Sequence, residues 1–316
     1  MSVDRRRILA AALSVPLAFP ALRRPRAAES KTLRVGFQKG EPVLMAAKAH
    51  KTLEAALGPK GYTVEWIEFQ FGPPMLEAMR VGSIDFGAVG DTPPVFAQAA
   101  RGDLLYAGAL RGAPQSLLLP AGSKIEALAD LKGRKIAFGR GSSAHHFTLL
   151  VLEKAGLRYD QIQPTYLGPA DAGAAFERGA VDAWSIWQPY TSLFDNRPGV
   201  RTLITNKEVA EQFGFLMGNG PFVRANPDVT ARVVEVLAQT ARTAQGHHEY
   251  IAAVLATATG IAQDVWTRAL AKHPFEVLRM DDALTQSQQK VADRFRALGL
   301  VPIDIKVSDI VWRASA

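Results

Sequence analysis

The sequence contains no cysteine among its 316 residues. Disulfide bonds, thiolate nucleophiles and metal sites with cysteine ligands are therefore excluded. After residue 30, no apolar run reaches the length of a membrane span. With 48% hydrophobic and 21% charged residues, the composition is typical of a globular protein with a sizeable core.

The first 28 residues have the pattern of a secretory signal peptide. Three arginines at 5–7 precede an apolar run from Ile8 to Phe19, and Ala28 precedes a polar break. The start, Asp4 followed by these arginines, is similar to a twin-arginine signal, which exports a protein already folded. We therefore expect residues 1–28 to be removed and the mature protein to be exported.

This leader carries most of the positive charge of the chain. The formal net charge is +7, but removal of residues 1–28 takes away six arginines and one aspartate and leaves +2. A charge this small does not indicate a basic surface for nucleic acid. We expect no nucleic-acid partner.

Strand-like and helical segments alternate along the mature chain, a pattern typical of an α/β fold. They form two similar sets, followed after about residue 220 by a helical tail. The first set has strands at 33–37, 63–69, 86–89 and 104–109, with helices near 42–57, 73–81 and 93–100. The second set has strands at 135–138, 165–167 and 183–187, with helices near 143–155, 170–178 and 188–195.

Two motifs of the first set recur in the second, in the same order. At offsets of 101 and 97 residues, VGFQKG (35–40) recurs as IAFGRG (136–141), and MRVGSIDFG (79–87) recurs as ERGAVDAW (177–184). In the second pair, a helix ends at Gly82 or Gly179, where a left-handed cap suits glycine, and Asp85 or Asp182 leads into a buried strand. The equal order and similar offsets indicate a duplicated unit.

The duplication predicts two lobes. Because the first set has few strands, we expect the chain to return to it, which gives lobe I at 31–112 plus 220–316 and lobe II at 113–219. Crossings are then expected near Arg111–Gln115 and Met217–Phe222. Open α/β sheets bind ligands beyond the carboxyl ends of their strands. The loops expected there are 38–42, 90–94, 139–143 and 187–190.

The segments LRVGFQKG, GDTPPVFAQA, GSSAHHF and GAVDAWSIWQPY resemble the aliphatic-sulfonate-binding periplasmic proteins of ABC importers. The similarity covers nearly the whole mature chain. It implies a two-lobed type II periplasmic-binding-protein fold with a ligand cleft between the lobes, and a periplasmic monomer without a cofactor. It also implies delivery of an aliphatic sulfonate to a permease and its ATPase, with no chemistry on the ligand.

The predicted site follows from the chemistry of a sulfonate, which stays anionic at physiological pH and therefore needs hydrogen-bond donors. Ser142 and Ser143 offer hydroxyls and backbone N–H groups at the positive end of a predicted helix. Phe37, Trp187 and Tyr190 can supply apolar walls for the organic tail. The full predicted set is Gln38, Gly72, Pro73, Gly90, Asp91, Thr92, Gly141, Ser142, Ser143, His145 and Trp187.

The sequence leaves several alternatives open. Asp91 repels an anion unless it caps the following helix or pairs with the amine of taurine. Taurine, sulfate esters, nitrate and thiamine precursors are bound by proteins of the same general fold. Ser142 and His145 can be arranged as a nucleophile and base, but no G-x-S-x-G motif or acidic orienting residue accompanies them. The adjacent His145 and His146 lack the spacing of a helical metal site.

Overall fold

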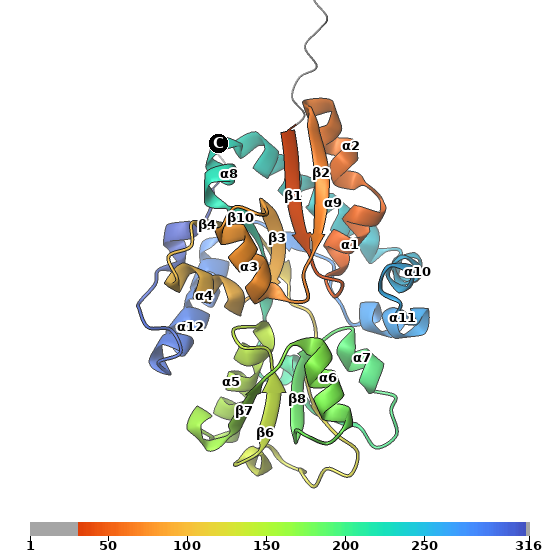
Figure 1. Ribbon diagram of the computed structural model, residues 1–316, viewed down its shortest axis with the longest axis vertical. Coiled ribbons are helices and arrows are strands. Elements are labelled where there is room, and N and C mark those ends of the chain that lie inside the picture. The colour runs from red at the N-terminus through yellow and green to blue at the C-terminus, as the bar shows by residue number, and fades with distance from the viewer. Residues whose placement is uncertain (1–30, 314–316) are drawn as a thin grey trace, which may run out of the picture.

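The computed structural model describes residues 31–313 (Figure 1). The predicted signal peptide lies outside the described residues. Two mixed sheets, each covered by helices, form two bodies that lie one above the other in this view. Within residues 31–313, no helix combines the length and the apolar character needed to cross a bilayer.

The first sheet has six strands in the order β11-β4-β10-β3-β1-β2. They are β1 (Lys31–Phe37), β2 (Tyr62–Glu68), β3 (Phe86–Gly90), β4 (Leu104–Arg111), β10 (Phe213–Asn219) and β11 (Val277–Leu278). β1 pairs in parallel with β2 and β3, whereas β10 pairs antiparallel with β3 and β4.

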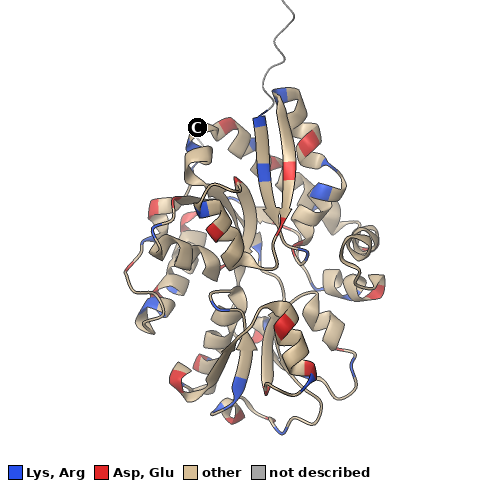
Figure 2. Cartoon of the chain, in the orientation of Figure 1, with Lys and Arg blue, Asp and Glu red and all other residues tan. Residues whose placement is uncertain are grey.

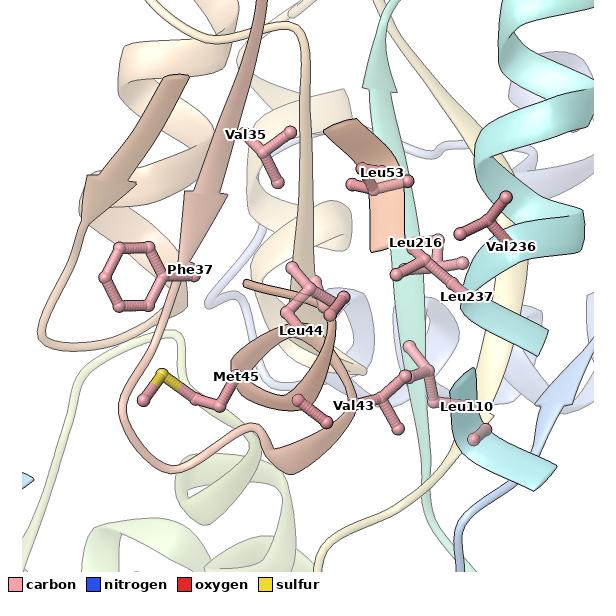
Figure 3. Packing of buried hydrophobic residues seen from close by; sticks show 14 of the residues in the cluster. Val35, Phe37, Val43, Leu44, Met45, Leu53, Leu110, Leu216, Val236 and Leu237 are labelled. Atoms are coloured by element: carbon pink, nitrogen blue, oxygen red, sulfur yellow. The ribbon is translucent and has the colours of Figure 1, made fainter. Parts of the chain in front are cut away.

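Helices cover both faces of the first sheet. One face carries α1 (Pro42–Ala49), α2 (Thr52–Leu57), α9 (Pro227–Gln245), α10 (His248–Thr259) and α11 (Gln263–Ala271). The other carries α3 (Gly72–Arg80), α4 (Thr92–Ala99) and α12 (Asp282–Ala297), and α8 (Gly220–Ala225) joins β10 to α9. Figure 3 shows the first of these cores, where Val35 of β1, Leu44 of α1 and Leu237 of α9 are buried together. The helix predicted at 42–57 is broken in two, because Lys51 adopts a left-handed conformation with φ 51°.

The second sheet has five strands in the order β7-β6-β8-β5-β9. They are β5 (Gln115–Leu119), β6 (Lys135–Phe138), β7 (Gln163–Tyr166), β8 (Ala183–Trp187) and β9 (Arg201–Thr205). One face packs on α5 (Ser143–Ala155), and the other packs on α6 (Pro169–Glu177) and α7 (Tyr190–Phe194). Trp184 is fully buried between Phe176 and Phe194, in the core of this second body.

The predicted repeat is present in the strand pairing and in its hydrogen bonds. β6 pairs in parallel with β7 and β8 as β1 does with β2 and β3. Asp85 accepts the N–H of Arg34 at 2.8 Å, and Asp182 accepts the N–H of Lys135 at 2.7 Å, so each aspartate ties its strand to the neighbouring strand. The glycines that end the preceding helices are both left-handed: Gly82 (φ 74°) and Gly179 (φ 66°).

The chain crosses between the sheets twice. The first crossing joins β4 to β5 between Arg111 and Gln115, as predicted. The second joins β9 to β10 through residues 206–212, so the crossing predicted at Met217–Phe222 is wrong, and so is the boundary after residue 219. The apolar sequence of β10, FGFLMGN, suits a buried strand of either sheet, and its hydrogen bonds to β3 and β4 place it in the first.

Figure 2 shows the charged residues in the same orientation. Lysine and arginine alternate with aspartate and glutamate over both bodies of the visible face. This mixture agrees with the small net charge expected after removal of the leader.

Candidate functional site

A small cavity of about 80 Å³ lies between the two bodies, at the carboxyl ends of β1, β3 and β8. Six of the eleven predicted ligand-binding residues line it: Gln38, Gly72, Gly90, Ser142, Ser143 and Trp187. The loops that the repeat predicted to face one another therefore share one crevice. A larger cavity, about 650 Å³, lies between α2, α9 and α10, away from these strand ends.

The walls of this cleft approach each other closely. A Cβ atom added to Gly90 would lie 2.7 Å from the Cβ of Ser143, on the opposite body. A Cβ added to Gly40 would lie 3.1 Å from the carbonyl oxygen of Gln188 and 3.5 Å from Nε1 of Trp187. These contacts describe a closed arrangement, and glycine is needed at Gly90 because a side chain there would separate the bodies.

Four helices begin at the cleft, and they differ in the donors that they offer. α3 and α4 each have two prolines in the first turn, which removes two backbone N–H groups from each start. α1 begins with Pro42 and is capped by the carboxylate of Glu41. α5 begins without proline and without a side-chain cap. Its start is therefore the best supplied with free donors.

The start of α5 is shaped by the turn that precedes it. Ser142 occupies the N-cap position, but its hydroxyl donates to the carbonyl oxygen of Gly139 at 2.7 Å instead of capping the helix. The N–H groups of Ser143 and Ala144 precede the first helical hydrogen bond, which His145 N–H donates to Ser142 O. Ser142 and Ser143 line the cavity, so the positive end of the α5 helix dipole lies at its wall.

Glu41 brings a carboxylate to the same cavity. Its Oε1 accepts the N–H of Val43 at 3.1 Å, and its Oε2 accepts the N–H of Leu44 at 2.6 Å. Burial raises the pKa of Glu41 to about 7 in spite of these two hydrogen bonds, which favour the ionised form. The loop containing Glu41 was predicted to line the cleft, but this residue was not singled out.

The base of the cleft holds a chain of polar side chains that joins the two crossings. Gln115 Nε2 donates to Gln212 Oε1 at 2.9 Å, and Gln212 Nε2 donates to Asp91 at 3.1 Å. Asp91 also accepts a 2.6 Å hydrogen bond from Nδ1 of His146. Since a carboxylate only accepts hydrogen bonds, Nδ1 of His146 carries the proton. The other ring nitrogen, Nε2, accepts a hydrogen bond from Arg294 at 3.1 Å.

This chain connects the two bodies. His146 lies on α5 of the second body, whereas Asp91 and Arg294 belong to the first. The guanidinium of Arg294 also forms two hydrogen bonds with Glu153 of α5, at 2.6 and 3.1 Å. The closed arrangement is therefore held on this side by polar contacts as well as by packing.

The structure corrects the predicted role of Asp91. It occupies the N-cap position of α4, but its side chain makes no cap hydrogen bond. It is 1% exposed and accepts from His146, Gln212 and Thr92, because these donors surround it in the closed arrangement. Asp91 does not line the cavity, so the expected pairing with the amine of taurine is not supported.

The predicted role of His145 as a ligand donor is corrected as well. Its Nδ1 accepts the N–H of Gly141, and its Nε2 bonds to the hydroxyl of Tyr159 at 3.0 Å. The ring stacks on Phe138, and burial, with the nearby charge of Arg140, lowers the pKa of His145 to about 3. This neutral ring supports the turn before α5 and has no free nitrogen for a ligand, a serine or a metal. Residues 31–313 contain no cluster of three side chains able to hold a metal ion.

The remaining predicted residues lie beside the cavity and do not line it. Thr92 is fully buried and donates to Asp91, and Gly141 packs against Phe96. Pro73 has no N–H to donate. Of the expected apolar walls, Trp187 lines the cavity, whereas Phe37 belongs to the core of the first body and Tyr190 packs on Trp184.

Sequence reasoning missed several residues that line the cleft. They are Gly40, Glu41, Arg111, Gln115, Gln212, Phe213 and His273. Arg111 and Gln115 stood at the ends of the predicted first crossing and could have been chosen for that reason. Gln212 was missed because the second crossing was placed too late in the chain. His273 follows α11 in the helical tail, where no sequence signal connects it to the cleft.

Comparison with known proteins gives consistent relatives. The family described as ABC transporter, phosphonate, periplasmic substrate-binding protein matches residues 50–266. A relative from Escherichia coli (strain K12), named as an aliphatic sulfonates-binding protein, is 39% identical over 292 residues, which is 91% of each chain. A Bacillus subtilis (strain 168) relative of the same name is 32% identical and covers 89% of this chain and 86% of its own. The alkanesulfonate-binding protein SsuA from Xanthomonas axonopodis pv. citri, solved bound to MOPS, is 39% identical with a TM-score of 0.85, covering 91% of this chain and 100% of that one.

These similarities extend over the cleft as well as over both bodies. The two-body architecture is that of the periplasmic-binding-protein fold. Proteins of this kind bind a solute and do not transform it. The chain belongs to the periplasmic substrate-binding proteins of ABC transporters, in the family of the aliphatic sulfonates-binding proteins.

Proposed function

We propose that the protein captures an aliphatic sulfonate between its two bodies and presents it to an ABC importer. The start of α5 carries this proposal, because it offers N–H groups and the Ser143 hydroxyl at the wall of a closed cleft. Hydrogen bonds to a charged group contribute about 1.5 to 3 kcal/mol each. A few of them support micromolar binding after the costs of association.

The charge of the cleft favours a monoanion over a dianion. Arg111 is the one arginine among the described residues that line the cavity, and it is already paired with Glu211 and Glu276. A dianion such as a phosphonate therefore finds no free cation in the described lining. Trp187 and Phe213 provide aromatic surface for an organic tail.

The partners follow from the family. We propose that the closed protein delivers its ligand as a monomer to a permease, which is coupled to an ATPase. Residues 1–28 would direct export to the periplasm before this step. Both bodies would face the permease, because closure is what distinguishes the loaded protein from the empty one.

The test removes the backbone N–H of Ser143 and compares this change with loss of the hydroxyl alone. Ser143 is the first residue of α5, where proline is tolerated, and Ser142 before it is extended, with φ −90° and ψ 169°. Ser143→Ala removes only the hydroxyl, whereas Ser143→Pro also removes the N–H. We expect Ser143→Pro to weaken the binding of ethanesulfonate or octanesulfonate by roughly a further 10- to 100-fold.

Binding is measured by titration calorimetry, and thermal unfolding shows whether each variant is folded. A panel of ethanesulfonate, octanesulfonate, taurine, sulfate and nitrate defines the ligand class. If Ser143→Pro binds sulfonates as tightly as Ser143→Ala, the anion is held elsewhere. Turnover of any of these compounds would exclude a binding protein.

A further inference from the structure

Glu41 is not explained by a simple alkanesulfonate. It lines the same small cavity as Ser142 and Ser143, and it forms no ion pair with a described residue. A sulfonate carries a permanent negative charge, and like charges repel each other strongly where water is excluded. A cleft for alkanesulfonates alone would gain affinity from any neutral residue at this position.

A second acceptor lies at the base of the cleft. Gln115 lines the cavity and is 2% exposed, and its Oε1 has no hydrogen-bond partner among the described residues. The orientation of its amide follows from Asp91, which accepts from Gln212 Nε2 and so makes Gln212 Oε1 the acceptor for Gln115 Nε2. Gln115 Oε1 is therefore left to receive a hydrogen from the ligand, and a buried acceptor without a donor is costly.

We propose that the cleft selects aminosulfonates, with the ammonium group held by Glu41 and Gln115 Oε1 and the sulfonate held at the start of α5. This inference rests on the proposed function, since it assigns the other end of the same ligand. An ammonium group has three hydrogens to donate and a positive charge. It satisfies both acceptors and neutralises the carboxylate.

The two classes of sulfonate then differ in their pH dependence. Among described residues, the ionisable groups that line the cleft are Glu41, Arg111 and His273. Arg111 stays charged and paired, and burial lowers the pKa of His273 to about 4, so His273 is neutral near pH 7. Lys39, next to this loop, pairs with Glu68. Since burial raises the pKa of Glu41 to about 7, Glu41 is the group that changes charge between pH 6 and 8.

The sign of each effect follows from the charge that each ligand requires. An alkanesulfonate binds with Glu41 protonated, so its affinity falls as the pH rises through about 7. An aminosulfonate binds with Glu41 ionised, so its affinity increases over the same range. Each change amounts to about tenfold between pH 6 and pH 8.

The experiment compares taurine with 1-propanesulfonate, in which a methyl group replaces the ammonium. Affinities are measured by calorimetry at pH 6 and pH 8 in bis-Tris and Tris, because sulfonate buffers compete for the site. At pH 8, we expect taurine to bind at least tenfold more tightly than 1-propanesulfonate. Between pH 6 and pH 8, the affinity of taurine should rise and that of 1-propanesulfonate should fall. Glu41→Gln should abolish both differences.

Two further variants complete the experiment: an alternative to Glu41→Gln and a control. Glu41→Ser removes the charge but keeps a good N-cap for α1, in case Glu41→Gln folds poorly. Glu65→Gln removes an exposed carboxylate of β2 outside the cavity and should change neither slope. If taurine and 1-propanesulfonate bind with equal affinity and the same pH dependence, the inference is overturned and the proposed function stands. If no sulfonate binds at either pH, both fail.

Discussion

The starts of α1 and α5 occupy equivalent places in the repeat, yet they present opposite charges to the cleft. Each follows a first strand and a glycine-containing turn, VGFQKG before α1 and IAFGRG before α5. In α1, the Glu41 carboxylate occupies the helix N-terminus. In α5, the Ser142 hydroxyl turns back to Gly139 and leaves the N-terminus to the cavity.

This difference shows how a duplicated unit can become a site for a ligand with two ends. A helix N-terminus binds an anion whether the anion belongs to the protein or to a ligand. In α1, the protein supplies its own carboxylate, and Glu41 also lines the cavity. In α5, the anion must come from the ligand. The same backbone geometry thus gives a cation-binding wall and an anion-binding wall.

The largest expected effect comes from making α5 resemble α1. In Ser142→Asp, the new carboxylate cannot donate to Gly139 O, so it should turn to cap the first N–H groups of α5. We expect sulfonate affinity to fall at least 100-fold, or about 2.7 kcal/mol, while the unfolding temperature stays the same or rises. Calorimetry and thermal unfolding measure the two effects.

Ser142→Asn is the matched control for this change. Asparagine has nearly the same shape and is an equally good N-cap, but it adds no charge. It should therefore weaken binding less than aspartate does. Equal losses in the two variants would mean that the charge of an anion is not what the start of α5 recognises.

The repeat and most of its elements could be predicted from the sequence, because they rest on local signals. The strand at 135–138, the helix at 143–155 and the strand at 183–187 have the predicted bounds. Apolar periodicity and glycine ends define such segments without reference to the rest of the chain. The strands β5 and β9 were missed, since β5 follows the first crossing, β9 precedes the second, and they depend on pairing with β8 and with each other.

The site was harder to predict because it depends on closure of the two bodies. The GSS turn and Gly90 could be proposed from the repeat, but their contact across the cleft follows only from the packing. Asp91 and His146 illustrate the limit, since a 2.6 Å hydrogen bond joins residues 55 apart in sequence. The cleft-lining position of Glu41 likewise becomes visible only when the cavity is present.

An intermediate effect is expected from pH, which acts on the two helix starts in opposite directions. Between pH 4.5 and about 7, the unfolded chain ionises Glu41 while the folded chain keeps its proton, so acidification stabilises the fold through α1. Between pH 6.5 and about 3, the unfolded chain protonates His145 while the folded chain does not, so acidification destabilises the fold through α5. His273, whose pKa is lowered to about 4, acts in the same direction as His145.

Glu41→Gln removes the stabilising effect of Glu41 at acidic pH. The destabilising effect of His145 and His273 should then determine how the free energy of unfolding changes with pH. From pH 6.5 to 4.5, the variant should lose stability more steeply than the wild type, by up to about 1.4 kcal/mol per pH unit. Urea unfolding at several pH values measures these slopes, and Glu65→Gln, which removes an exposed carboxylate outside the cavity, should follow the wild type. Parallel slopes for Glu41→Gln and the wild type would show that Glu41 titrates normally in the folded protein.

The smallest expected effect concerns the contacts that hold the two helix starts together. Arg294 joins α12 to Glu153 and His146 of α5, so Arg294→Met should weaken the closed arrangement while keeping the apolar stem. Partly exposed pairs contribute up to about 1 kcal/mol, which limits the loss of sulfonate affinity to roughly fivefold. Small-angle scattering should show a larger radius of gyration for the variant than for the wild type without ligand, and the same radius when sulfonate is saturating.

Arg296→Met is the control. It breaks a pair with Asp304 inside one body and should leave both measurements unchanged. A matching response of the two variants would mean that the Arg294 contacts do not control closure, and that α1 and α5 are brought together by the ligand alone.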